Sequence, residues 1–446
     1  MTGLAKGDTL AIMAGNYADG GNFSHLEGIT IINHNGPVNF GNTVSISHLN
    51  NVTITGTGKE GLVYGFRFSR FKGDAFLVTN KCMGLRIGNC EYVDVNGNAI
   101  NAGIFFTVYN GDSSTMALYK TSIYNQHLLR TGALFVGSWA PVSTFQNVVD
   151  SISFSNVRID STISDVNQVL ACSIYRMVAH EWTILGGCPN GKHDAGIFQT
   201  TGNGTIYNIY RNGGWGYLWR IWNVGLNGRA DSYCYNCIDL NTDTYGTIDT
   251  RIDAADTTTH SNIPFLRGSN MHIFNNTSGN KRDAINYVSV FVVAGTFFSQ
   301  NGYKLEIRNN LSFNTKTDNA NHLVKQNTID PLSDTSNNLY VDDPVKSGVL
   351  LDMNDCYIAQ GSPVIDRGVD IPMIKTDIAG ISRPKGKSYD IGAREFPSDN
   401  VTTNSAIRGE RKILTLLAAS LLVIGTIIFL LFRSFAFSRK NKKVHS

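Results

Sequence analysis

Little charge, little proline and almost no amphipathic-helix periodicity are the first features of this sequence. Of its 446 residues, only 16% are charged and only 10 are proline. The 42% that are hydrophobic still suffice for a packed core, which excludes a disordered chain. The net charge of +3 becomes −2 without the five basic residues after position 432, because 33 basic and 35 acidic residues remain. A nearly neutral body lacks the basic face that nucleic acid requires, so we expect no nucleic-acid partner.

A disulfide framework and a zinc motif are also missing. The seven cysteines are an odd number without regular spacing, which argues against a disulfide scaffold. Cys234 and Cys237 form a CxxC pair, but no second pair lies nearby to complete a tetrahedral zinc site. We interpret both as small buried core residues of an alternating strand. No Asp-x-Asp-x-Asp-Gly loop occurs, so the sequence leaves any metal ligands unknown.

No secretory leader is recognisable at Met1–Tyr17, whereas the other end carries a long apolar run. Residues 413–432 read ILTLLAASLLVIGTIIFLLF, and about 20 such residues span a bilayer as a helix. The basic tail 433–446 indicates that the tail is cytoplasmic and that the body is extracellular or periplasmic. We therefore predict a single-pass membrane protein with a linker at 398–412 and a leader upstream of Met1. A tail-anchored protein with a cytoplasmic body is the competing interpretation.

Short alternating strands that end at Asn, Gly or Asp fill most of the remaining sequence. Several come as close pairs around an Asn, which tolerates a left-handed backbone conformation and fits tight corners. Asn residues stacked at the same corner of successive coils would form a hydrogen-bonded ladder. The clearest strand segments are 52–55, 85–87, 93–95, 152–154, 157–159, 206–209, 305–307 and 311–313.

The long run of such units predicts a solenoid with coils of roughly 20–30 residues. Hairpin turns at Asn35-Gly36, Asn96-Gly97 and Asn227-Gly228 would instead favour arrays of β-sandwiches. The lack of helices and the repetition favour the first alternative. We predict an all-β chain, a right-handed parallel β-helix over residues 1–397, followed by one C-terminal transmembrane α-helix.

Two segments carry a resemblance to known proteins. Residues 361–368 (GSPVIDRG), 377–383 (DIAGISR) and 390–395 (DIGARE) resemble the closing segment, SPxIDxG…DxxGxxR…DIGAxE, of many secreted bacterial β-helix proteins of the pectate-lyase-like superfamily. Residues 7–17 (GDTLAIMAGNY) are similar to their first coil. The resemblance implies the β-helix fold, with a closing segment at about 340–397, and its Asp, Gly and Arg residues are expected to form an end-cap network.

The resemblance also implies a chemistry, since related proteins mostly act on acidic polysaccharides by β-elimination. That reaction requires neutralisation of the uronate carboxylate by Ca²⁺ or Arg, a base for the C5 proton and an acid for the leaving oxygen. Ca²⁺ is accordingly the one cofactor that we expect. The densest group of suitable side chains lies between His180 and Arg251. Stray histidines elsewhere, including His34 and His127, are interpreted as loop or surface residues.

Coil stacking places Asp194 near Arg220 and Asp231 near Arg251, because these pairs are separated by 26 and 20 positions. The catalytic candidates are Lys192, His193, Asp194, Arg220 and Asp231, with Asp194 and Asp231 also suited to a glycoside hydrolase. The candidates for substrate binding are Trp215, Trp219, Trp222, Tyr233, Arg229 and Arg251.

Two functions remain open from the sequence. The first is a membrane-anchored enzyme or binder of extracellular polysaccharide, with lyase chemistry as the preferred reaction. The second is a non-enzymatic adhesin or scaffold, with protein partners in a surface assembly, in which Arg–Asp pairs and aromatic residues only stabilise the solenoid. An accessible basic and aromatic groove would favour the first, and a buried, fully paired cluster would favour the second.

Overall fold

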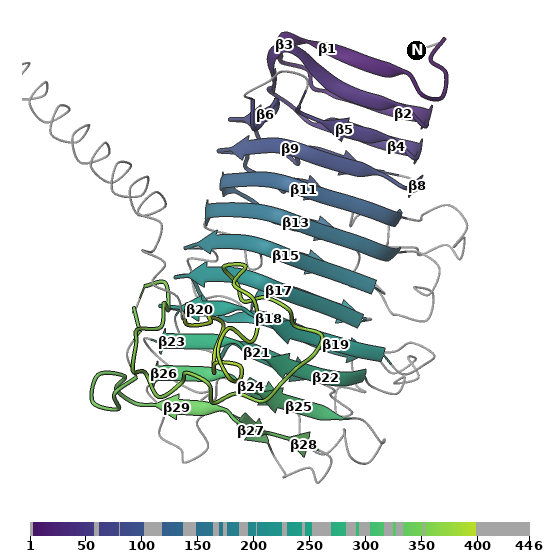
Figure 1. The fold of residues 1–446 in the computed structure, drawn as a ribbon. Helices are drawn as coiled ribbons and strands as arrows, with labels where there is room; N and C mark the ends of the chain where they lie inside the picture. The colour runs from purple at the N-terminus through teal and green to yellow at the C-terminus, as the bar shows by residue number, and fades with distance from the viewer. Residues whose placement is uncertain are drawn as a thin grey trace, which may run out of the picture. The chain divides into compact units, whose positions relative to one another are not determined.

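The described part of the chain is a parallel β-helix (Figure 1). A computed structural model describes residues 3–57, 62–79, 81–101, 118–136, 149–163, 169–172, 176–186, 195–201, 203–224, 230–242, 246–251, 269–281, 291–293, 304–315, 324–326, 333–349, 351–352 and 354–397. Within these ranges, 29 strands form one continuous sheet, and every ladder between them is parallel. The prediction of an all-β parallel β-helix is therefore confirmed.

One ladder of strands follows one side of the coils. Its members pair in the order β2 (Gly21–Glu27), β4 (Val44–Asn50), β7 (Phe76–Val78), β10 (Ile100–Asn101), β12 (Leu134–Val136), β14 (Leu170–Cys172), β16 (Ala195–Thr201), β18 (Tyr217–Val224), β21 (Ile248–Arg251), β24 (Phe291–Val293) and β27 (Val324–Gln326).

The remaining strands, most of them longer, form the rest of each coil. They are β1 (Thr9–Tyr17), β3 (Thr30–Phe40), β5 (Thr53–Thr55), β6 (Phe66–Ser69), β8 (Cys82–Met83), β9 (Arg86–Val93), β11 (Leu118–Thr131), β13 (Val149–Thr162), β15 (Arg176–Leu185) and β17 (Asn203–Asn212). Beyond β17 each long strand divides at a corner into β19 (Ala230–Tyr235) and β20 (Ile238–Leu240), β22 (Ser269–Phe274) and β23 (Thr277–Lys281), β25 (Leu305–Arg308) and β26 (Leu311–Thr315), and β28 (Ser333–Asp334) and β29 (Leu339–Val341).

A column of left-handed corner residues marks the bend within every long strand. Nearly all are Asn, which adopts positive φ at less cost than other side chains. The Asn125 amide donates to Asn89, and Asn156 donates to Asn125 at 3.2 Å, so the predicted Asn ladder is present. The column, with φ between 48° and 60°, consists of Asn89, Asn125, Asn156, Glu181, Asn208, Asn236, Asn275, Asn309 and Asn337.

The coils are less uniform than the sequence predicts. The spacing of paired residues is 21 for Thr9 and Thr30 but 39 for Ala230 and Ser269. The predicted range of 20–30 residues is therefore too narrow, because insertions between strands lengthen individual coils without changing the ladders. The sandwich alternative is wrong, since Asn35-Gly36 lies inside β3 and turns no hairpin.

The closing segment, defined here as residues 342–396, lies along the flank of the last coils. Four corner residues bind its backbone: Asn236 donates to the Thr376 carbonyl, Asn275 to Asp390, Asn309 to Val369 and Asn337 to Arg367. The expected polar network exists, but its place differs from the expected end cap. Side-chain amides that bond to one another in earlier coils here hold a second layer of chain (Figure 1).

In the strands beneath this second layer, apolar side chains face outward and polar side chains face the interior. Ile238, Leu240, Leu311 and Phe313 form a separate core cluster with Val341, Val349, Val364, Ile391 and Ala393. The intervening Asp239 is fully buried among polar groups of the coils themselves. Apolar side chains thus face outward in these coils because the closing segment covers them.

The predicted transmembrane helix at 413–432 lies outside the described residues, as do the linker at 398–412 and the tail at 433–446. Among the residues that are described, none belongs to a helix long and apolar enough to cross a membrane.

Candidate functional site

Four of the predicted site residues lie outside the described part of the chain. These are Lys192, His193, Asp194 and Arg229. For two others only the backbone is described: Trp222 in β18 pairs in register with Arg251 in β21. Asp231 and Arg251 are not opposite each other in the strand register, because Asp231 in β19 lies opposite Asn270 in β22 and accepts a hydrogen bond from its amide at 2.7 Å.

Arg220 is buried and paired with a carboxylate that the sequence analysis did not select. Its Nε lies 3.0 Å from Oδ2 of Asp249, which stands directly opposite on β21 and is fully buried. The guanidinium also lies over the ring of Phe198, 5.8 Å from its centroid. These contacts match the structural alternative weighed from the sequence, an internal Arg–Asp pair between adjacent coils.

The aromatic residues predicted to bind substrate differ in how far their side chains are exposed. Trp219 is 0% exposed and belongs to the main core, which corrects its prediction as a sugar-stacking residue, because no ligand face is available. Trp215 is partly buried against the same core. Tyr233 is half-buried and stacks on His272 at a centroid distance of 4.5 Å.

A buried polar cluster occupies the interior of the coils whose apolar side chains face the closing segment. The Arg211 guanidinium donates to both oxygens of Asp239, at 2.6 and 3.0 Å, and to the carbonyls of Gly216 and Tyr217. Lys281 pairs with the same carboxylate, and burial lowers the pKa of its ammonium group to about 8. Every partner is an internal group, so the cluster holds the 213–217 turn in place and offers no access to a substrate.

An ion-pair chain on the outside of the coils provides the best candidate site. The His127 chain, as we call it, consists of Arg67, Glu91, His127, Asp160 and Arg158. His127 Nδ1 lies 3.1 Å from Glu91 and Nε2 lies 2.9 Å from Asp160. Arg67 Nε lies 3.5 Å from Glu91, and Arg158 Nε donates to Asp160 at 2.6 Å. The chain thus crosses the four strands β6, β9, β11 and β13.

The geometry favours the doubly protonated form of His127. Both ring nitrogens face carboxylate oxygens, which only accept hydrogen bonds, so both bonds form only when the imidazole carries both protons. The hydrogen bond to Glu91, with further support from Asp160, raises the pKa of His127. The same bond lowers the pKa of Glu91. Burial opposes the effect at Asp160, but hydrogen bonds from Arg158 and His127 outweigh it and lower the pKa of that carboxyl group.

The two arginines at the ends of the chain remain accessible to a ligand. Their side chains are 41% exposed for Arg67 and 55% exposed for Arg158. Each contacts its carboxylate through Nε, which leaves the Nη groups for planar, bidentate binding of an anion. Tyr64 stands against His127 at a centroid distance of 5.6 Å and adds an aromatic surface. Such a face suits an anionic ligand, and a doubly protonated His127 offers no free base.

Sequence reasoning missed this chain because it interpreted His127 as a stray surface residue. The available signal was the spacing of 36 positions from Glu91 and 33 to Asp160, which joins oppositely charged groups on adjacent coils. A coil length of roughly 20–30 residues, as the sequence predicts, does not connect residues that are 33 or 36 positions apart.

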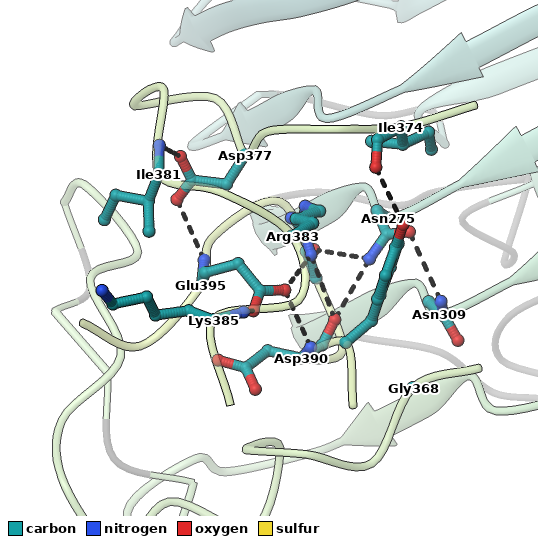
Figure 2. A network of polar contacts seen from close by, with 12 residues as sticks. Asn275, Asn309, Gly368, Ile374, Asp377, Ile381, Arg383, Lys385, Asp390 and Glu395 are labelled. Atoms are coloured by element: carbon teal, nitrogen blue, oxygen red, sulfur yellow. Dashed lines mark hydrogen bonds and ion pairs between the residues drawn. The ribbon is translucent and has the colours of Figure 1, made fainter. Parts of the chain in front are cut away.

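A second buried network lies inside the closing segment (Figure 2). Arg383 donates to Glu395 at 2.6 Å and to the Gly392 carbonyl at 2.9 Å, and both side chains are 0% exposed. Burial raises the pKa of Glu395 to about 7, against the opposing charge of Arg383. Asp377 accepts hydrogen bonds from the backbone of Ile381 and Glu395. These residues fix the segment's own fold, as the sequence analysis expected.

Metal binding finds no support in the described residues, where no group of three or more His, Cys, Asp or Glu side chains is arranged to hold an ion. The five cysteines with described side chains are free and buried, and for Cys234 and Cys237 this confirms their interpretation as core thiols.

The described strands define the class of this protein as a parallel β-helix. No protein family matches the sequence, and no curated protein matches it with significance. Among solved structures, the crystal structure of pectate lyase Pel9A is similar at 13% identity and a TM-score of 0.40, covering 88% of this chain and 89% of that one. A likeness at that level adds nothing about activity.

Proposed function

We propose that this protein binds an acidic polysaccharide along the outer face of its early coils, across strands β6 to β13. The observation that carries the proposal is the His127 chain, with its two exposed guanidinium groups held in fixed places on a parallel sheet. Fixed donors lose little entropy on binding, so they favour a ligand with matching anionic groups. A polymer with a repeating negative charge suits charged groups that are spaced across several coils.

Lyase chemistry remains a narrower proposal. Its candidates Lys192, His193 and Asp194 are not described, and the described candidate Arg220 is buried with Asp249. A Ca²⁺ requirement, attachment to a membrane by residues 413–432 and an extracytoplasmic location belong to the same proposal. A non-enzymatic scaffold or adhesin that uses the His127 chain for binding alone is the second candidate, favoured by the pairing of the buried Arg211, Arg220 and Lys281 with internal carboxylates.

The test measures binding of polygalacturonate and of a neutral polysaccharide by affinity electrophoresis and calorimetry at low and high salt. We expect the protein to bind the acidic polymer, with an affinity that falls as the salt concentration rises. Replacing both Arg67 and Arg158 by Ala should lower this affinity about tenfold. The matched control is Arg367→Ala, which removes an exposed Arg of the closing segment. Equal affinity in both variants, or no preference for the acidic polymer, would refute the proposal.

The same samples report on catalysis. Absorbance of the unsaturated uronate product, followed with and without Ca²⁺, separates an enzyme from a binder. Binding without product formation would leave the scaffold or adhesin as the function.

A further inference from the structure

A column of aromatic rings runs along the face that precedes the Asn corner. His180, Tyr207 and Tyr235 occupy equivalent positions on β15, β17 and β19. The ring of His180 stacks on Tyr207 at 4.8 Å and 0°, and Tyr207 stacks on Tyr235 at 4.9 Å and 4°. Each ring therefore covers the face of the next, at the spacing of adjacent strands. The Tyr235 end packs on the closing segment with Ile371 and Ile374.

Among the described residues, no ring follows His180 at the next position of this column. The position before His180 is Ser155 on β13, and the position before that is Tyr124 on β11. The Tyr124 ring leans away from Ser155 and lies over Gly88. A Cβ atom added to Gly88 would lie only 2.1 Å from Cζ of Tyr124. Two strand spacings, about 10 Å, separate the backbones that carry Tyr124 and His180. We call this interruption the Ser155 gap.

The side chains around the gap are small and hydroxylated. Ser122 and Ser153 occupy neighbouring positions of the same outward face on β11 and β13, paired in register with each other. All three serines are half-exposed. Arg86 pairs with Ser122 across the ladder and lies over the Tyr124 ring, 5.6 Å from its centroid. The surroundings thus offer hydroxyl groups below, the face of the His180 ring on one side and one exposed cation near Tyr124.

We propose that the Ser155 gap is a subsite for one pyranose ring, which continues the stack from His180 toward Tyr124. A ring of about the thickness of an aromatic side chain fits in the one strand spacing above Ser155, against the face of His180 opposite Tyr207. The three serine hydroxyls match the hydroxyl groups of a sugar, which an apolar side chain of a protein partner would leave unbonded. Arg86 lies on β9, the strand that also carries Glu91 of the His127 chain. The inference therefore rests on the proposed function and places one sugar unit of its ligand.

The test replaces Ser155 by a larger side chain that occupies the gap. Ser155→Phe adds the missing ring and should raise the Kd for a galacturonate tetrasaccharide at least tenfold, measured by calorimetry, with an unchanged or higher Tm. Ser45→Phe is the matched control, because Ser45 is also a half-exposed outward residue but lies on β4; its Kd should stay within twofold of the wild type. His180→Ala removes one ring face and should raise the Kd severalfold. Should Ser155→Phe fold poorly, Ser155→Val provides a smaller filler with a two- to fivefold expected rise.

The outcomes separate the two proposals. Wild-type affinity in the folded Ser155 variants overturns the subsite, whatever the Arg67 and Arg158 variants do. A loss in the Ser155 variants together with full binding in the Arg67 and Arg158 variants supports the subsite and overturns the role given to the His127 chain. A wild-type protein that binds no saccharide overturns both.

Discussion

Arg220 on β18 and Asp249 on β21 stand opposite each other on adjacent coils and form a buried ion pair of 3.0 Å. Removing one partner of such a pair leaves an uncompensated charge in the core, which typically costs about 3–5 kcal/mol. We expect Arg220→Ala to lower the free energy of unfolding by about that amount in chemical denaturation. Replacing both partners, as in Arg220→Met with Asp249→Leu, should recover most of the loss. A stable Arg220→Ala variant that lacks only lyase activity would restore the catalytic role predicted from the sequence.

The His127 chain makes stability depend on pH near neutrality. A histidine whose pKa is raised by folding stabilises the protein fully below its unfolded value of 6.5, and the contribution is lost as pH rises through the folded value. We expect His127→Gln to lose about 1–2 kcal/mol relative to the wild type near pH 6, and much less at about pH 9. Urea unfolding across this range measures the difference. His34→Gln is the control, because His34 is exposed and does not belong to the His127 chain. If the difference in the free energy of unfolding between His127→Gln and the wild type were the same at all pH values, it would argue against an imidazolium at 127.

Glu395 in the closing segment also has a raised pKa, and it predicts a second loss of stability with rising pH. Burial raises the pKa of this carboxyl group from 4.5 to about 7, so the folded protein keeps a proton that the unfolded chain has lost in that window. Stability should therefore fall as pH rises from 4.5 toward 7. Glu395→Gln, which cannot titrate, should flatten this part of the stability profile. The measurement is the free energy of unfolding at several pH values, and a wild-type curve parallel to that of the variant would contradict the assignment.

Attachment of the closing segment depends on the corner amides. Asn309 donates to the Val369 carbonyl at 2.7 Å and accepts from its N–H at 2.8 Å. Asn309→Gly preserves the positive φ but loses both bonds, and we expect it to cost about 1–3 kcal/mol. Asn280→Gly is matched, because Asn280 also has positive φ but accepts one exposed bond from Asn314; its cost should stay below about 1 kcal/mol. Similar losses in both variants, read from Tm, would show that the backbone conformation alone matters.

The apolar run at 413–432 predicts membrane attachment. A chain that ends at residue 397 should remain in the supernatant after membranes are sedimented, with the circular dichroism of a β protein. Leu421→Arg with Leu422→Arg in the full chain is the control, because each charge at the centre of a span costs about 3 kcal/mol. Sedimentation of the truncated chain with membranes would point to another anchor.

The sequence determined the fold class through local physics. Alternation of apolar residues over three to five positions, with Asn at the bends, specifies short strands and tight left-handed corners, and both follow from backbone sterics and side-chain period. The same local rules identified Cys234 and Cys237 as core residues, whereas the structural network at 361–395 was expected only from the resemblance of its motifs to other β-helix proteins.

Only the tertiary structure decided which side of a strand faces the core and which charged groups meet. Alternation is symmetric between the two faces, so the outward apolar side chains of Ile238 and Phe313 became buried only because the closing segment covers them. Coil length varies with each insertion, so spacing in the sequence could not pair Arg220 with Asp249 or His127 with Glu91 and Asp160. Those pairs depend on register between coils, which backbone hydrogen bonds set across the ladder.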